Sequence, residues 1–473
     1  MRRLFAGVLV AAPWLLGVQA AVALPGFTPV PGSPFATGSS PHSIAFDGRF
    51  VATADTGSND VSMFSVSSGG VLTPVPGSPF TTGAAPEAVA LAGGGVPGNG
   101  LLAVANSGSN NVSMFTVSAG GVLTPVPGSP FATGADPVAV VFGYGGAGTE
   151  LLFVANRGDN TVSQFDVSRD GSLLGGSPSP TGGVGPQSLA FVGVSSSGGA
   201  LAVANGGSNN LSIGAPAGRF VNAGPTGAAP SSVAFGPAIP TPGGVDVLAV
   251  ANSGSNNVSM FETLPPFGGG RVGPPFAAGA APSSVAFGPT GSILAVANRG
   301  DNNVSVFSVS SSGALAPVPG SPLSLGGGSG PASLAFSPDG SLLALANSTT
   351  NNISVFRVQS CTTQFNQGFN AGYDSGFKSE LRHSYRRHGA WQLGWKRGFQ
   401  DAHRRHAARR SARVAAPAAL ARSQSSPIAA VVGCDVVFNS GFNVGYKGGF
   451  KSAFNPAFRR GYKAGLAASH SHR

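Results

Sequence analysis

One stretch of eleven residues, ANSGSNNVSMF, occurs twice without change, at 105–115 and at 251–261. Weaker copies begin at Ala54, Ala155, Ala204, Ala297 and Ala346, which makes seven copies spaced 46 to 51 residues apart. A fixed period in this range is typical of repeat architectures, in which each small unit buries its apolar face against its neighbours. Any motif in this chain therefore has to be interpreted within a repeat.

Each copy has the pattern of two strands joined by a tight turn. In the second copy an apolar run at 101–105 leads into Asn- and Gly-rich residues at 106–110, and β-branched and aromatic residues follow at 111–117. Asn and Gly adopt positive φ at little steric cost, so they suit the turn. No segment before about residue 360 combines helix caps with a 3.6-residue apolar period, so we expect no helix there.

Two further strands recur around this hairpin. An inner strand follows a proline, as in SIAF at 43–46, and an outer strand precedes a Gly-Ser-Pro turn, as in LTPVPGSPF at 72–80. Four strands in each of seven units predict an all-β fold, a seven-bladed β-propeller. An open solenoid is the alternative, but it would need polar capping repeats, and we see none in the sequence.

The order of the strands predicts how the ring closes. The chain begins with an outer strand at 27–30, and its seventh unit ends at 352–358 without one. We expect the N-terminal strand to complete the seventh blade beside the last three strands, because closure removes the free edges that invite aggregation.

The N-terminus has the features of an export signal. Arg2 and Arg3 precede a mainly apolar run at 4–18, and small residues at 21–23 fit a cleavage site. We therefore assign 1–23 to a signal peptide and 24–360 to the propeller. The mature protein is expected to be secreted, extracellular or associated with the cell envelope.

The composition changes abruptly at Cys361. Residues 1–360 have a net charge of −4, whereas residues 361–473 have a net charge of +14. Charge asymmetry of this kind predicts a polyanionic partner, here an anionic polymer or a membrane surface. Nucleic acid is not the expected partner, because the aromatic residues of this basic tail fit a glycine ladder first.

That ladder has a period of four residues. A small residue followed by a large one recurs every four residues in 434–473 and, less perfectly, in 361–401, which predicts a C-terminal α-helical pair. A flexible, basic linker at 402–433 would join the two helices. Cys361 and Cys434 begin the two halves at matching positions, so we expect a disulfide between them; free thiols or pairing between chains are the alternatives.

The residue directly after each inner-strand proline differs between repeats whose other positions agree. Sites form where a rigid scaffold carries variable loops, so we expect a small-molecule or carbohydrate ligand at the propeller axis. His42 and Glu87 are the candidate catalytic residues, because a His–carboxylate pair can activate water for ester or lactone hydrolysis. The candidate binding residues are His42, Asp55, Glu87, Asp136, Arg157, Gln187 and Arg299. Ordinary solvated loop residues are the alternative interpretation.

Other motifs have structural interpretations. The first Asn of each turn, Asn106 in the second copy, is expected to hydrogen-bond its own hairpin backbone rather than to form a ring of ligands. The Arg-Gly-Asp tripeptides at 157–159 and 299–301 occupy turn positions that hold Ser-Gly-Ser elsewhere. We expect no metal site and no cofactor, because no framework of ligands or phosphate-binding loop is present.

The stretch PASLAFSPDGSLLALAN at 331–347, the NNISVF that follows and the repeated PVPGSP resemble the lactonase-type seven-bladed propellers and the related YVTN surface-layer repeats. The resemblance covers about 27–358 and excludes the tail. It implies a propeller fold, and with it either hydrolysis of a sugar lactone, as in 6-phosphogluconolactonase, or a binding role at a surface. This propeller has one histidine, no lysine and few charges, so our first hypothesis is an exported, non-catalytic binding or surface module whose tail contacts anionic envelope components. A lactonase-like hydrolase with its site at the axial channel mouth is the alternative.

Overall fold

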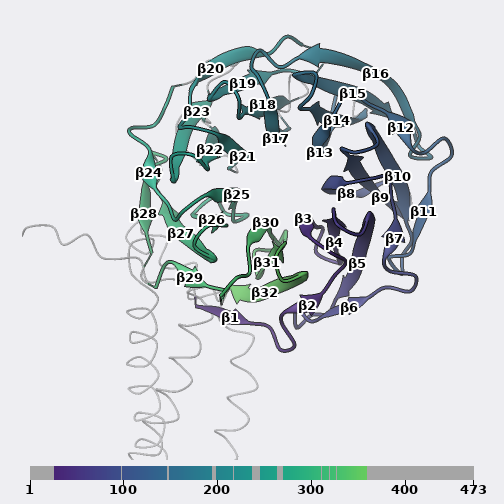
Figure 1. Cartoon of the computed structure of the whole chain (residues 1–473), viewed down its shortest axis with the longest axis horizontal. Coiled ribbons are helices and arrows are strands. Elements are labelled where there is room, and N and C mark those ends of the chain that lie inside the picture. The colour runs from purple at the N-terminus through teal and green to yellow at the C-terminus, as the bar shows by residue number, and fades with distance from the viewer. Residues whose placement is uncertain are drawn as a thin grey trace, which may run out of the picture. The chain divides into compact units, whose positions relative to one another are not determined.

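The computed structural model describes residues 26–358, apart from 97–98, 146–148, 194–198, 217, 237–245, 264–269, 311, 319 and 326. Its strands form seven antiparallel sheets that stand as blades around one central axis (Figure 1). The predicted seven-bladed all-β propeller is therefore confirmed. The predicted C-terminal helical pair, the linker, the signal peptide and both cysteines lie outside the described residues.

Three long strands make up most of each blade, and the second and third form the hairpin of the repeat. The inner strands of blades 1 to 7 are β3 (Pro41–Phe46), β8 (Pro86–Val96), β13 (Pro137–Tyr144), β17 (Pro186–Val192), β21 (Pro230–Phe235), β25 (Pro282–Phe287) and β30 (Pro331–Phe336). The second strands are β4 (Phe50–Asp55), β9 (Asn99–Asn106), β14 (Glu150–Asn156), β18 (Ala200–Asn205), β22 (Asp246–Asn252), β26 (Ile293–Asn298) and β31 (Leu342–Asn347). The third strands are β5 (Asp60–Val66), β10 (Asn111–Val117), β15 (Thr161–Val167), β19 (Asn210–Gly214), β23 (Asn257–Thr263), β27 (Asn303–Val309) and β32 (Asn352–Val358).

Most outer strands are short, and those of blades 1, 2, 6 and 7 are split in two by the Gly-Ser-Pro turn. In blade 2 the turn separates β11 from β12, and the Ser129 hydroxyl accepts a hydrogen bond of 2.9 Å from the Met114 N–H of the third strand. The side chain thus supplies the acceptor that the interrupted strand cannot. The outer strands, in order from blade 1, are β6 (Leu72–Pro74) with β7 (Phe80–Thr81), β11 (Leu123–Pro125) with β12 (Phe131–Ala132), β16 (Leu173–Pro180), β20 (Val221–Pro225), β24 (Phe276–Ala277), β28 (Leu315–Pro317) with β29 (Leu323–Ser324), and, in blade 7, β1 (Phe27–Pro29) with β2 (Phe35–Ala36).

Ring closure takes place in blade 7, as predicted. Strand β1 pairs antiparallel with β32, with Phe27 opposite Val358 and Pro29 opposite Phe356. The Val355 N–H also donates to the Ser33 hydroxyl over 2.9 Å, although 322 positions separate the two residues. The first and last parts of the propeller are therefore held in one sheet.

Neighbouring blades are joined by a repeated asparagine contact that the sequence pattern did not point out. The last turn residue of each hairpin has positive φ, and its side-chain oxygen accepts a hydrogen bond from the backbone N–H that precedes the inner proline of the next blade. The contact of Asn351 with the Ser40 N–H, at 2.7 Å, joins blade 7 to blade 1. The other six asparagines are Asn59, Asn110, Asn160, Asn209, Asn256 and Asn302.

The core lies between blades, because the second strands are buried on both faces. In β9, Leu102 and Val104 pack with Ala52 of blade 1, whereas Leu101 packs with Leu152 of blade 3. Successive residues of a strand point to opposite faces, so an uninterrupted apolar run fills two interfaces at once. Burying each such side chain contributes about 1.5–3 kcal/mol. Over the described residues, no helix has the length and apolar character needed to cross a membrane.

Candidate functional site

The variable residue after each inner proline is the extra residue of a β-bulge. In blade 1 the pairing of β3 with β4 shifts between Pro41 and Ser43, so His42 has no partner in the ladder. The same shift occurs at the equivalent place in the other six blades. A bulge turns a side chain out of the sheet, which explains how these positions can vary without disturbing the blade.

A second position of the repeat lies beside the bulge, directly after the second strand. In four blades it holds Ser or Thr, whose hydroxyl donates to a backbone carbonyl near the inner proline: Thr56, Ser107, Ser253 and Ser348. Blades 3 and 6 have Arg157 and Arg299 here instead. A guanidinium extends well beyond a hydroxyl, so only these two blades send a cation outward from this position.

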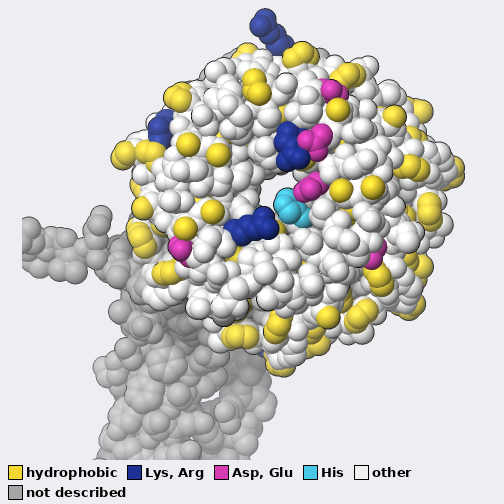
Figure 2. Space-filling view, viewed as in Figure 1, with side chains coloured by type: hydrophobic (Ala, Val, Ile, Leu, Met, Phe, Trp, Pro, Cys, Tyr) yellow, Lys and Arg dark blue, Asp and Glu magenta, His cyan; other side chains and the backbone are white. Residues whose placement is uncertain are grey.

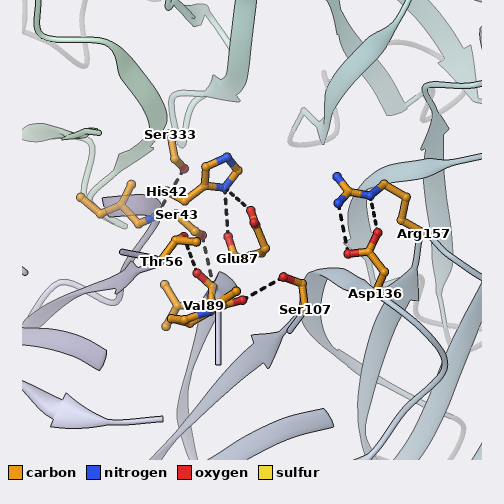
Figure 3. A network of polar contacts seen from close by, with 12 residues as sticks. His42, Ser43, Thr56, Glu87, Val89, Ser107, Asp136, Arg157 and Ser333 are labelled. Carbon is orange, nitrogen blue, oxygen red and sulfur yellow. Dashed lines mark hydrogen bonds and ion pairs between the residues drawn. The ribbon is translucent and has the colours of Figure 1, made fainter. Parts of the chain in front are cut away.

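These positions bring charged side chains to the opening at the centre of the ring, where Figure 2 shows basic, acidic and histidine atoms around one hollow. His42 Nδ1 lies 2.9 Å from Glu87 Oε2 and 3.3 Å from the Glu87 carbonyl oxygen. Beside this pair, Arg157 Nε lies 2.6 Å from Asp136 Oδ2, and its Nη2 lies 3.1 Å from Oδ1 (Figure 3). We refer to His42, Glu87, Asp136, Arg157 and Arg299 as the axial charged group.

The two residues of the first pair shift each other's pKa. Burial lowers the pKa of His42, but the hydrogen bonds and the negative charge of Glu87 together outweigh burial, and the pKa is raised above 6.5. Burial alone would raise the pKa of Glu87, but the contact with His42 and the charges of Arg157 and Arg299 lower it. The charged pair is therefore lost as the pH rises through the raised pKa of His42, or falls through the lowered pKa of Glu87.

Replacing Glu87 with glutamine should lower the pKa of His42, because the carboxylate is lost while burial and the charge of Arg299 remain. NMR titration of the His42 ring, assigned with a His42→Gln variant, measures this. Asp136→Asn is the matched control, since it breaks the other pair and should leave the titration of His42 in place. An unchanged pKa in Glu87→Gln would contradict the assigned cause.

The remaining predicted binding residues lie in different surroundings. Arg299 belongs to the axial charged group, because its positive charge acts on both His42 and Glu87. Gln187 occupies the bulge of blade 4, next to Gly206, whose missing side chain leaves room for it. The structure does not bring Asp55 to this group: it is fully buried within the hairpin of blade 1, where Oδ2 accepts hydrogen bonds from Ser62.

The first turn asparagines are tied within their own hairpins, but to side chains rather than to the backbone expected. Asn106 is fully buried, and its Nδ2 donates to Asn111 Oδ1 over 2.8 Å and to Ser113 Oγ over 2.9 Å. The aspartates of the two Arg-Gly-Asp tripeptides are also occupied within the fold. Asp159 accepts from the Ala135 N–H and Asp301 from the Ala280 N–H, so both clamp the segment that enters their own blade.

A belt of serine contacts supports the wall beneath the opening. The Val89 N–H donates to Ser43 Oγ over 3.2 Å, and the Ile44 N–H donates to Ser333 Oγ over 3.4 Å, each between neighbouring inner strands (Figure 3). Equivalent contacts join blades 4 to 5, 5 to 6 and 6 to 7. The bulged side chains therefore rest on inner strands that are fixed to one another.

The chemistry open to the axial charged group is ion pairing, hydrogen bonding and proton transfer at His42. Within the described ranges, His42 has no hydroxyl or thiol among its hydrogen-bond partners. No three His, Cys, Asp or Glu side chains of those ranges converge in a way that could hold a metal ion. Aligning the seven repeats points out Arg157 and Arg299, because both replace a small residue at the position directly after the second strand.

Comparison with known proteins gives a family match over part of the chain. The family model described as a lactonase, 7-bladed beta-propeller, matches residues 243–371, which include the strands from β22 to β32. The fold is thus that of a lactonase-like propeller. No curated protein sequence matches the chain.

Solved structures with similar backbones come from proteins of several kinds. Hydrazine synthase from Kuenenia stuttgartiensis is 19% identical with a TM-score of 0.49, and the match covers 73% of this chain and 99% of that one. A catalytically inactive virginiamycin B lyase from Staphylococcus aureus with quinupristin is 15% identical with a TM-score of 0.48, over 70% and 98% of the two chains. A protein provisionally assigned as a 6-phosphogluconolactonase, from Bacteroides fragilis, is 17% identical with a TM-score of 0.48, over 62% and 86%. None of these likenesses bears on substrate or site.

Proposed function

We propose that this lactonase-like propeller is an exported, non-catalytic binding module that accepts a small-molecule or carbohydrate ligand at its axial opening. In this proposal the basic tail, residues 361–473, attaches the protein to anionic components of the cell envelope. The observation that carries the proposal is the axial charged group itself. Five charged or titratable side chains gather at one opening of a propeller that has few charges, and residues in or beside the strands of four blades hold them there.

The surroundings of His42 favour binding over catalysis. Nucleophilic catalysis needs a hydroxyl or thiol next to its base. The nearby hydroxyls of Thr56 and Ser107 donate instead to backbone carbonyls, at 2.6 Å and 3.0 Å. A raised pKa also leaves a smaller fraction of the imidazole in the neutral form that can accept a proton.

A lactonase-like hydrolase is the second candidate, and the His42–Glu87 contact is the observation that favours it. Glu87 holds Nδ1 of the ring, which leaves Nε2 available to a water molecule, as in other His–carboxylate pairs. A panel of lactones assayed with the full chain and with His42→Ala separates the two candidates. Turnover that is lost in His42→Ala would establish the hydrolase, whereas absence of turnover with every lactone supports a binding module.

Attachment through the tail should depend on salt. The full chain is expected to be retained on anionic vesicles or polymers at about 0.1 M salt and released at about 1 M, because the Debye length falls from about 10 Å to about 3 Å. Replacing Arg404 and Arg405 with glutamine should weaken retention, while Arg219→Gln with Arg271→Gln in the propeller removes the same number of charges and serves as the matched control. Equal retention of both variants would argue against attachment through the tail.

A further inference from the structure

Arg157 and Arg299 occupy the same position in two repeats, yet only one of them has a carboxylate partner. In both blades the Arg backbone N–H donates to the carbonyl of the residue that precedes the inner proline: Arg157 to Asp136 over 2.9 Å, and Arg299 to Ala281 over 3.1 Å. Asp136 and Ala281 also share a left-handed backbone, with φ of 55° and 46°. The backbone frames around the two arginines therefore match, and the residue that precedes the inner proline is Asp136 in one blade and Ala281 in the other.

That difference leaves Arg299 without an ion pair among the described residues. Ala281 has a methyl group where Asp136 has a carboxylate. The nearest acidic residue in sequence, Asp301, is occupied by the Ala280 N–H at 2.7 Å. Arg299 is solvent-exposed, and its charge reaches both His42 and Glu87. It is thus a cation at the axial opening whose hydrogen-bond donors remain available.

The charges of the axial group can be counted from these contacts. His42 in its protonated form neutralises Glu87, and Arg157 neutralises Asp136, so Arg299 leaves one net positive charge at the opening. A guanidinium presents a planar fork that matches a carboxylate in a bidentate contact. A phosphate monoester has a charge of about −1.5 to −2 near pH 7, which exceeds this single charge.

We propose that Arg299 determines the specificity of the axial opening and that the ligand carries one carboxylate, as an acidic sugar does. This assignment rests on the proposed function, because it assumes that the opening binds a ligand. Arg157 cannot serve in the same way while Asp136 accepts hydrogen bonds from its Nε and Nη2 and neutralises its charge. The surrounding pairs fix the position of the ligand, and Arg299 supplies the attraction that a neutral sugar cannot use.

The test installs the missing partner. Ala281→Asp reproduces at Arg299 the environment of Arg157, and Asp adopts positive φ more readily than Ala, so the fold should tolerate it. Calorimetric titration of the full chain with D-glucuronate, D-glucose and D-glucose 6-phosphate measures the effect. We expect the unmodified protein to bind glucuronate about tenfold more tightly than glucose, and Ala281→Asp to lose that preference. The tail is identical in both proteins, so its own attraction for anions cancels.

Two further variants keep the test decisive. Arg299→Gln should remove the same preference if Ala281→Asp does not fold, and Asp136→Ala, which removes the carboxylate that pairs with Arg157, should strengthen glucuronate binding. Equal binding of glucose and glucuronate, unchanged in Ala281→Asp, would overturn the assignment of Arg299 while leaving a binding module in place. Tighter binding of glucose 6-phosphate than of glucuronate would overturn the choice of a carboxylate. Absence of binding with all three sugars, and no change in the His42 NMR signal, would overturn the axial binding function and this assignment together.

Discussion

Replacing Asp55 with asparagine is expected to raise the free energy of unfolding by about 2–4 kcal/mol above pH 7. Asp55 stands where the other six blades have a buried asparagine, and it is itself fully buried. Burial, with the negative charge of Asp60 adding to it, raises the pKa of the Asp55 carboxyl to about 7, although hydrogen bonds from Ser62 oppose the rise. Asparagine keeps the shape and cannot ionise, so it removes the cost of a buried charge.

The sign of the pH dependence follows from that raised pKa. The ordinary value for Asp is 3.8, so between about pH 4 and 7 the folded protein holds a proton that the unfolded chain has released. The contribution of Asp55 to the free energy of unfolding is fully present below pH 3.8. It is lost as the pH rises through 7. The advantage of Asp55→Asn should therefore be near zero at pH 4 and reach its full size at about pH 8.

Denaturant unfolding at several pH values, followed by circular dichroism, measures this effect. Tryptophan fluorescence is unsuitable, because Trp14, Trp391 and Trp395 all lie outside the described propeller. The reciprocal variant Asn106→Asp is the matched control: it places a carboxyl at the equivalent buried position of blade 2 and should lose stability above pH 7. A stability difference for Asp55→Asn that does not vary with pH would contradict a buried, titrating carboxyl.

The second large effect concerns ring closure. Val30 follows β1, is 2% exposed, and packs in the cluster of blades 7 and 1 with Phe64 and Leu342. Its N–H donates to the Val355 carbonyl over 2.9 Å. Val30→Ala removes two buried methyl groups, and we expect it to lower the free energy of unfolding by about 2 kcal/mol.

Val75 provides the control for this prediction, because it occupies the same place of the outer strand in blade 1. It is 4% exposed, and its N–H donates to the Met63 carbonyl over 3.0 Å. If the N-terminal strand belongs to the cooperative unit, Val30→Ala and Val75→Ala should shift the denaturation midpoint by similar amounts. If the N-terminal strand detached before global unfolding, Val30→Ala would hardly shift the denaturation midpoint, whereas Val75→Ala would still lower it.

The sequence predicted the blades well, because each hairpin is specified locally. The apolar run at 101–105 and the turn residues that follow it settle a strand and its reversal without help from the rest of the chain. Closure by the N-terminal strand was also predictable. The seventh repeat lacks an outer strand, and the chain begins with an outer strand that precedes the first repeat. Because the same strand and turn pattern occurs in seven repeats, each occurrence supports the assignment of the others.

The candidate site was predictable only in part. The repeat pattern pointed to the position of His42 and Glu87, because it varies where its neighbours do not. It could not distinguish Asp55, which lies within a hairpin, from Asp136, which pairs with Arg157 at the opening. Asp55 ends a second strand, Glu87 lies in a bulge and Asp136 precedes an inner proline, and only three-dimensional neighbours decide which of them face the axis.

The amino-acid sequence by itself determined the number of blades, the order of their strands and the way the ring closes, because these depend on short patterns read along the chain. Tertiary structure alone decided which charges at the opening neutralise one another and which is left over. His42 meets Glu87 from the next blade, Arg157 meets Asp136, and Arg299 has no ion pair among the described residues, since Ala281 stands in the place of Asp136. Such partners lie about twenty to forty-five residues apart, and a one-dimensional period carries no information on the distance between side chains that folding brings together.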